Sequence, residues 1–176
     1  PGDVILTTGI HGLSKLGFLI KNKIYLDNDI SLNKRLISKS IEHFCRPKVY
    51  PNFLKNLIKT RSNKKIKRIG CTDSSDGLFQ ALQDLASASK CKAIINYEKI
   101  PKDKDWPRGD KWDEYYFFGG EDYELVFSLP KKWAKNLSKL DKDINEIGFF
   151  ADGEPSIEFK DNKKNKLFNN TPFKHF

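Results

Sequence analysis

The sequence predicts an α/β (α+β) domain in which helices pack against a mixed β-sheet. Short β-branched or alternating runs and longer stretches with helical periodicity follow one another along the chain, which is typical of such domains. The chain has 176 residues, a length that suits one domain with a substantial core. Aromatic residues make up 12% of the chain, 13 of them Phe, which indicates a packed interior. We therefore expect residues 1–176 to form a single domain.

Six segments have the composition of strands. The run VILTT at 4–8 is β-branched and precedes two glycines, as expected for a strand that enters a tight turn. In the segment 66–72, Ile69 and Cys71 are the positions most suited to burial. The expected strands cover residues 4–8, 66–72, 92–97, 123–129, 144–150 and 156–159.

Six further segments have helical periodicity. Ser31 can cap a helix whose apolar residues recur on one face, at Leu32, Leu36, Ile37, Ile41 and Phe44. In the segment 52–60, Phe53, Leu54 and Ile58 are expected to face inward. The expected helices cover residues 14–21, 31–45, 52–60, 75–87, 111–118 and 131–140, with a surface loop at 99–110 and a loose segment at 161–171.

Composition argues against several functions. The formal net charge is +9, but the lysines are spread along the chain and arginines are few, so we expect a solvated surface and no nucleic-acid partner. No apolar run approaches the roughly 18 residues of a membrane span. The thiols of Cys45, Cys71 and Cys91 are too scattered for a zinc site, and we expect buried structural cysteines in a reducing, cytoplasmic compartment.

The segment 72–77 (TDSSDG) lies where a strand is expected to lead into a helix that begins at Ser75. Asp73 and Asp76 are three residues apart, so both carboxylates can project at the same place. Such hard oxygen ligands suit Mg²⁺, and free amides at a helix start suit a phosphate. The alternative is that these Ser and Asp residues only cap the helix.

The segment 119–125 (GGEDYEL) places three carboxylates within four residues, directly after two glycines. Glycine allows a close approach of a ligand to the backbone, and carboxylates beside an apolar strand are costly without a partner. Alternation predicts that Asp122 and Glu124 point one way and Tyr123 and Leu125 the other, with Glu121 at the turn. The alternative is a helix C-cap followed by an exposed strand edge.

The first turn, TGIHG at 8–12, could also bring backbone amides to a phosphate. It lacks a Walker pattern, and a lone histidine such as His11 is more often a surface or core residue than a catalyst.

Together these stretches resemble thiamine-monophosphate kinases, within the wider family related to aminoimidazole ribonucleotide synthetase. The opening PGDVI with its following Thr-Gly, the Arg46-Pro47 step and the segments DSSDGL and DLASAS are all similar to that family. GGEDYEL is the most specific match, and Ile147-Gly148 and the final FKHF complete the series in family order. The resemblance implies the C-terminal domain fold of this family.

The resemblance also implies roles for single residues. Asp73 and Asp76 would be ligands of Mg²⁺, Ser75 would contact ATP, and Glu121 and Phe173 would contact thiamine monophosphate. No residue would form a covalent intermediate, because phosphate would pass directly from ATP to the substrate. The sequence departs from the family pattern at Leu13, Ser74 and Lys174.

The resemblance covers a C-terminal domain, whereas the family also has an N-terminal domain with an Asp-rich metal and ATP cluster and a homodimer interface. No such domain precedes Pro1 in this sequence, so we expect the isolated chain to be inactive. Two alternatives remain: an ATP-dependent enzyme of the same superfamily with another small substrate, such as a purine-pathway or selenophosphate-forming enzyme, or a non-catalytic binding module.

Overall fold

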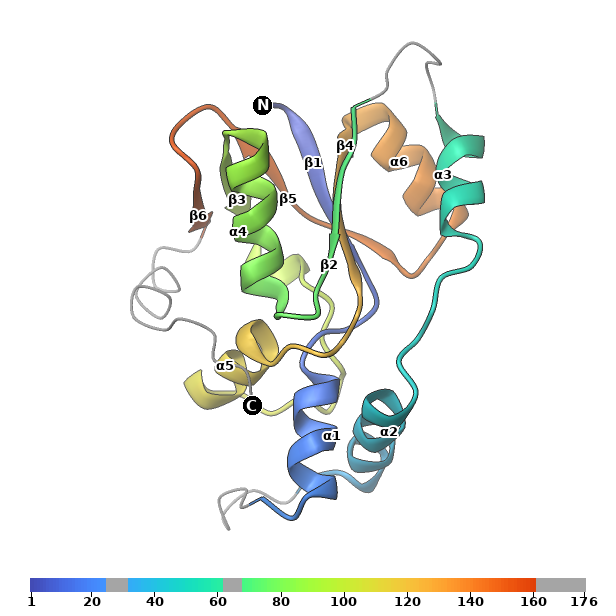
Figure 1. Cartoon of the computed structure of the whole chain (residues 1–176), viewed down its shortest axis with the longest axis vertical. Helices are drawn as coiled ribbons and strands as arrows, with labels where there is room; N and C mark the ends of the chain where they lie inside the picture. Colours follow the sequence, from blue (N-terminus) through green and yellow to red (C-terminus); the bar gives the residue numbers. More distant parts are fainter. Residues whose placement is uncertain (25–31, 62–67, 161–176) are drawn as a thin grey trace.

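The computed structural model describes residues 1–24, 32–61 and 68–160 (Figure 1). Within these ranges six strands form one mixed sheet in the order β2-β4-β1-β5-β3-β6. The β3–β6 pair is parallel and the other pairs are antiparallel. The strands are β1 (Asp3–Thr8), β2 (Gly70–Asp73), β3 (Lys92–Ile95), β4 (Leu125–Pro130), β5 (Ile144–Ala151) and β6 (Ser156–Phe159).

Helices cover both faces of this sheet and extend beyond one end of it, where α1 and α2 lie at the bottom of Figure 1. The helices are α1 (Leu13–Lys21), α2 (Lys34–Cys45), α3 (Phe53–Thr60), α4 (Leu78–Ser89), α5 (Asp110–Phe118) and α6 (Lys131–Leu140), with a 3₁₀ turn η1 at Tyr97–Lys99. The predicted class, helices on a mixed sheet, is confirmed. None of the helices in the described ranges combines the length and the apolar character that a bilayer crossing requires.

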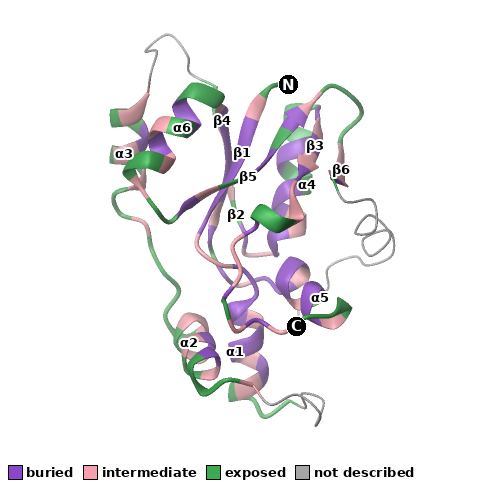
Figure 2. Ribbon diagram, turned by 180° about the vertical axis from the view of Figure 1, so that it is seen from behind, coloured by how far each residue is buried: buried purple, intermediate pink, exposed green. Residues whose placement is uncertain are grey.

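Strand β1 is buried along most of its length (Figure 2), and the alternation of its side chains divides the core in two. Ile5 packs with residues of α1, α4 and α5 in the larger cluster, whereas Val4 and Leu6 pack with residues of α3 and α6 in the smaller one. Successive residues of a strand point to opposite faces of the sheet. Both faces of β1 are therefore buried. The run VILTT at 4–8 predicted the strand but not that both of its faces would be covered.

Several predictions of which side chains are buried were wrong, because tertiary packing determines which face of an element is covered. On α3, Phe53 packs against the smaller cluster as expected, but Leu54 and Ile58 are each 63% exposed and the buried residue is Leu57. Ile69, just before β2, and Cys71 in β2 are exposed, since β2 is an edge strand of the sheet. Cys45 is exposed too, and only Cys91 fits the expectation of a buried structural thiol.

The expected surface loop at 99–110 is partly interior. Trp106 is buried and packs edge-to-face against Trp112 of α5. Asp103 is buried as well, and it pairs with Arg35 and Lys39 of α2. The abundance of Pro, Asp and Lys suggested a solvated segment, but these ion pairs with α2 compensate the burial of the carboxylate.

Two helix starts differ from the sequence-based expectation. Helix α2 begins at Lys34, where the side chain of Asn33 accepts a hydrogen bond from the amide of Arg35. The predicted cap, Ser31, lies outside the described residues. Helix α4 begins at Leu78 and not at Ser75, which changes the geometry of the segment that carries Asp73 and Asp76.

Candidate functional site

The two acidic motifs meet at one end of the sheet. Strand β2 ends at Asp73, which lies opposite Leu125, the first residue of β4. The segments that adjoin these strand ends, 74–77 and 119–124, are therefore side by side. The amide of Ser74 donates to the carbonyl of Glu124 over 2.9 Å, and the amide of Glu121 donates to the carbonyl of Ser75 over 2.7 Å. Two acidic segments that are far apart in the sequence are thus adjacent in the fold.

The segment after β2 is a turn, closed by its own aspartate. Oδ1 of Asp73 accepts a hydrogen bond of 2.9 Å from the amide of Ser75. Hydrogen bonds from the Ser75 side chain and amide lower the pKa of Asp73, so this carboxylate is ionised at neutral pH. The N-cap of α4 is Gly77, which has no side chain to cap the helix, so the predicted helix start at Ser75 is wrong.

Gly77 follows this turn with a φ of +95°. A Cβ atom at this position would lie 2.8 Å from the carbonyl oxygen of Phe117, near the end of α5. The turn thus packs directly on the helix that precedes Gly119 and Gly120. Because glycine accepts both this φ and this contact, Gly77 lets the turn pack against the end of α5, directly before the second motif.

The loop 119–124 alternates inward and outward side chains, as predicted, although β4 begins only at Leu125. Glu121 and Tyr123 have positive φ angles of 61° and 53°. Asp122 and Glu124 are each 1% exposed, while Tyr123 is 44% exposed. Strand β4 lies between β2 and β1, so the alternative of an exposed strand edge is wrong.

Asp122 holds the start of α1. Its carboxylate accepts hydrogen bonds from the amides of Gly12, over 2.5 Å, and Ser14, over 2.9 Å. Burial raises the pKa of Asp122 to about 6, against the opposing effect of these two hydrogen bonds. The amides of the first turn that were candidates for a phosphate thus bind a carboxylate of the chain itself.

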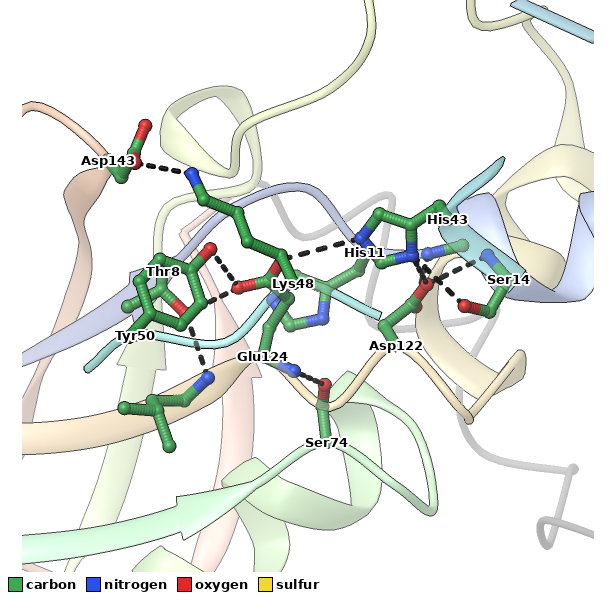
Figure 3. Close-up of polar contacts among 12 residues, drawn as sticks. Thr8, His11, Ser14, His43, Lys48, Tyr50, Ser74, Asp122, Glu124 and Asp143 are labelled. Atoms are coloured by element: carbon green, nitrogen blue, oxygen red, sulfur yellow. Dashed lines mark hydrogen bonds and ion pairs between the residues drawn. The ribbon is translucent and has the colours of Figure 1, made fainter. Parts of the chain in front are cut away.

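Glu124 is the centre of a buried polar network (Figure 3). It accepts hydrogen bonds of 2.5 Å from the hydroxyls of Thr8 and Tyr50, and His43 lies 3.5 Å away. Burial alone would raise the pKa of Glu124, but hydrogen bonds from His43, Thr8 and Tyr50 outweigh it and lower the pKa. The network joins β1, α2 and the segment before α3 to the acidic loop.

The space for the Glu124 carboxylate depends on Gly9. A Cβ atom on Gly9 would lie 1.9 Å from Oε1 of Glu124. Glycine at this turn is thus required by the packing of an internal carboxylate, whereas the sequence had suggested the approach of a phosphate.

Two histidines, His11 and His43, lie in this region and make different contacts. His11 is fully buried, with Nε2 at 2.7 Å from the Thr7 hydroxyl, and burial lowers its pKa to about 4. It is therefore a neutral core residue. His43 of α2 lies 3.1 Å from the Ser14 hydroxyl and 3.7 Å from Asp122. Sequence analysis missed His43, because the periodicity of α2 says nothing about which residue approaches a distant loop.

Three of the predicted site residues, Asp73, Asp76 and Glu121, lie near the exposed side chain of Tyr123. The Tyr123 hydroxyl donates a hydrogen bond of 2.7 Å to Oε2 of Glu121. This bond raises the pKa of Tyr123, and the charges of Asp73 and Asp76 raise it further. Asp73 is exposed, and Ser75, Asp76 and Glu121 are half-buried. Phe173, the other predicted substrate contact, lies outside the described residues.

The donor set at this site suits a hard cation. Asp73 and Asp76 offer carboxylate oxygens and Ser75 a hydroxyl, all in the reach of solvent. In the part of the chain that the structure describes, no group of three or more His, Cys, Asp or Glu side chains is arranged around a common metal position. Mg²⁺ typically uses one or two carboxylates and completes its shell with water and phosphate oxygens, so these residues fit a magnesium–phosphate complex.

This fold, with its two linked acidic segments, defines the class of the protein. Residues 1–158 match the family described as AIR synthase related protein, C-terminal domain. The chain belongs to this family, and the predicted family fold is confirmed.

Within this class, the relatives point to one enzyme. The chain is 33% identical over 176 residues to the thiamine-monophosphate kinase of Prochlorococcus marinus, across 100% of the chain and 53% of the relative. It is also 33% identical over 187 residues to that of Buchnera aphidicola subsp. Schizaphis graminum, across 99% of the chain and 53% of the relative. The chain thus spans about half the length of the curated relatives that it matches.

Solved structures agree with this fold. Thiamine-monophosphate kinase from Stenotrophomonas maltophilia K279a superposes with a TM-score of 0.71 at 22% identity, over 90% of this chain and 50% of that one. The structure of AaThiL complexed with AMPPCP and TMP superposes with a TM-score of 0.67 at 25% identity, over 90% of this chain and 47% of that one. The hydrogenase maturation protein HypE of E. coli shares the fold with a TM-score of 0.55 at 18% identity, over 90% of this chain and 46% of that one.

Proposed function

We propose that this chain is the C-terminal half of a thiamine-monophosphate kinase, which transfers the γ-phosphate of ATP to thiamine monophosphate and yields thiamine diphosphate. The observation that carries this proposal is the junction of the DSSDG turn with the GGEDYEL loop, through the 2.7 Å bond from Glu121 to Ser75. The identity with thiamine-monophosphate kinases over the whole chain supports it.

Asp73 and Asp76 are proposed to bind Mg²⁺, and Ser75 to contact ATP. The lowered pKa of Asp73 keeps that carboxylate ionised, as a metal ligand must be. Mg²⁺, when bound, would neutralise charge on the phosphates of ATP, which supplies much of the catalysis of phosphoryl transfer. The chain's own residues would hold the cation and orient the nucleotide.

Glu121 is proposed to bind thiamine monophosphate, next to the nucleotide contacts of Ser75. The proposal for Phe173 as a second substrate contact comes from the family resemblance. AaThiL, at 25% identity, was solved with AMPPCP and TMP, an ATP analogue and the substrate that we propose here. The binding of both ligands by a relative supports a site that takes both.

In the proposed reaction, an oxygen of the substrate's phosphate attacks the γ-phosphorus of ATP. The bond from that phosphorus to the β,γ-bridging oxygen breaks, and ADP leaves with the bond's electrons. The two products are thiamine diphosphate and ADP. Positioning and charge neutralisation are the main requirements of such a transfer, so no covalent intermediate on the chain is needed.

The complete site is proposed to need a second domain. The matched relatives are about twice as long as this chain, and the family resemblance implies an N-terminal domain with further metal ligands and a homodimer interface. Within the described residues the carboxylate pair Asp73 and Asp76 has no third ligand of the same kind. We therefore expect the isolated chain to fold but not to turn over ATP.

The test is an assay of the full-length protein with ATP, Mg²⁺ and thiamine monophosphate. Asp76→Asn should lower kcat/KM by about 10³-fold, equivalent to roughly 4 kcal/mol of transition-state stabilisation. The matched control is Asp152→Asn, an exposed carboxylate in the turn between β5 and β6, which should leave the rate unchanged. Absence of thiamine diphosphate formation by the wild-type protein would refute the proposed function. Turnover by the isolated chain would refute the need for a second domain.

A further inference from the structure

Tyr123 has a relation to Glu121 that the sequence motif did not reveal. Its hydroxyl donates to Oε2 of Glu121 over 2.7 Å. In the described part of the chain, the Glu121 carboxylate receives no other side-chain hydrogen bond. The orientation of this carboxylate therefore depends on a neighbour two residues away in the same loop.

The backbone fixes both partners in an unusual conformation. Glu121 and Tyr123 have φ angles of 61° and 53°, in the left-handed region that non-glycine residues rarely adopt. Such conformations persist only where the surroundings hold them. Here the amide of Glu121 donates to Ser75, the amide of Glu124 donates to the Ser74 hydroxyl over 3.1 Å, and Asp122 is bound to the start of α1.

This anchoring has a geometric consequence. With Asp122 and Glu124 held inward, Glu121 and Tyr123 both project outward from the same short loop. Their side chains can then meet across the intervening residue, as they do on a strand where i and i+2 share a face. The conformation of this loop thus brings the side chains of Glu121 and Tyr123 within hydrogen-bonding distance.

We propose that Tyr123 is a positioning residue, which holds the Glu121 carboxylate in the orientation that binds substrate. This inference rests on the proposed function and deepens it. With Oε2 bound to the Tyr123 hydroxyl, Oε1 remains as the oxygen that can accept from a ligand. The substrate group recognised at Glu121 is therefore a hydrogen-bond donor or a cation, and not the phosphate.

The surroundings explain why the hydroxyl, and not the ring, is the group to test. The Tyr123 ring lines an apolar groove of about 600 Å³ together with Val49, Tyr50 and Leu54. Phenylalanine would keep this wall and remove only the hydrogen bond. Because Tyr123 is 44% exposed, the Tyr123→Phe variant should fold as the wild type does.

The first experiment is steady-state kinetics of the full-length protein. Tyr123→Phe should raise KM for thiamine monophosphate by about 10-fold, the expected loss for one hydrogen bond to a charged group, with kcat and the KM for ATP within about 2-fold of wild type. The matched control is Tyr115→Phe, a half-buried tyrosine of α5, which should change neither constant. An unchanged KM in Tyr123→Phe would overturn the proposal.

A double-mutant cycle separates positioning from a structural effect. If Tyr123 acts through Glu121, then Tyr123→Phe should add less than about 2-fold to the KM of a Glu121→Gln variant. Equal effects of Tyr123→Phe in both backgrounds would show that the tyrosine acts by another route, and would overturn the proposal even with a KM change.

A titration distinguishes failure of this inference from failure of the proposed kinase. NMR of ¹³Cζ-labelled tyrosine, with the Tyr123 signal assigned by its loss in Tyr123→Phe, reports the pKa of the hydroxyl without any substrate. The pKa of Tyr123 is raised by Glu121, so Glu121→Gln should lower it. An unchanged titration would show that the contact is absent, whatever the enzyme's activity.

Discussion

At the scale of single residues, the acidic loop shows how burial and hydrogen bonds decide the behaviour of a carboxylate. Asp122 and Glu124 are equally buried, but burial raises the pKa of Asp122 whereas three side-chain hydrogen bonds lower the pKa of Glu124. Asp122 receives its hydrogen bonds from backbone amides only. The sequence could show that these carboxylates need partners, but the partners come from three other parts of the chain.

The raised pKa of Asp122 predicts a specific pH dependence of stability. Between the unfolded pKa near 3.8 and the folded value of about 6, the folded state binds more protons, so this residue's contribution falls as the pH rises through that window. Asp122→Asn removes the titration. The variant should therefore be destabilised more at pH 5 than at pH 7.5, with a difference of about 1–1.5 kcal/mol.

Urea denaturation at a series of pH values, with Asp152→Asn as the exposed control, measures this difference. A destabilisation by Asp122→Asn that is the same at every pH, or that grows as the pH rises, would show that Asp122 is already ionised in the folded protein at low pH.

At the scale of elements, Gly77 links the turn after β2 to the end of α5. A Cβ atom there would combine a φ of +95° with a contact of 2.8 Å to the Phe117 carbonyl. Gly77→Ala should therefore destabilise the protein by about 2–4 kcal/mol. Gly2 has a similar φ of +81° with nothing within 4 Å of the added atom, so Gly2→Ala should lose only about 1 kcal/mol.

Chemical denaturation measures the loss of stability in both variants. Gly2→Ala reports backbone strain alone, and Gly77→Ala reports backbone strain together with the steric clash against Phe117. Equal losses in Gly77→Ala and Gly2→Ala would mean that the turn does not rest on α5, and that the two acidic segments are joined by their hydrogen bonds without this contact.

Local sequence patterns were sufficient to locate most helices and strands, but not to predict which of their faces are exposed. Helix α6 begins at Lys131 and ends at Leu140 as predicted, because Pro130 marks its start and Trp133, Ala134 and Leu137 repeat on one face. On α3 the same reasoning chose Phe53, Leu54 and Ile58. Phe53 packs on the smaller cluster, but Leu54 and Ile58 are exposed and Leu57 is buried instead. A short helix with apolar residues on several sides does not specify which side meets α6.

At the scale of the whole molecule, the sequence indicated which segments carry the candidate site, but not the hydrogen bonds that link its side chains. The motifs at 72–77 and 119–125 indicated the two acidic segments that carry the site, and the register of β2 with β4 brings them together. The roles of Tyr50, His43 and Tyr123 could not be read from the sequence, because each depends on a tertiary contact or on positive φ angles that side-chain patterns do not encode.

The sheet also predicts that the two core clusters unfold together. Val4 and Leu6 of β1 belong to one cluster and Ile5 to the other. Because both clusters share this strand, the loss of packing in one cluster should also disrupt the other. The site needs both faces too, because Glu124 binds Thr8 of β1 and Tyr50 of the segment that leads into α3. We expect one cooperative transition for the described body.

The three tryptophans can test this, since Trp133 lies in the smaller cluster and Trp106 and Trp112 in the larger one. A Trp133→Phe variant reports the larger cluster by fluorescence, and a Trp106→Phe/Trp112→Phe variant reports the smaller. In each variant the fluorescence midpoint in urea should coincide with the midpoint from far-UV circular dichroism, even if the substitutions shift both. Separated midpoints would mean that one face melts first, and that the acidic site could be lost while half of the fold persists.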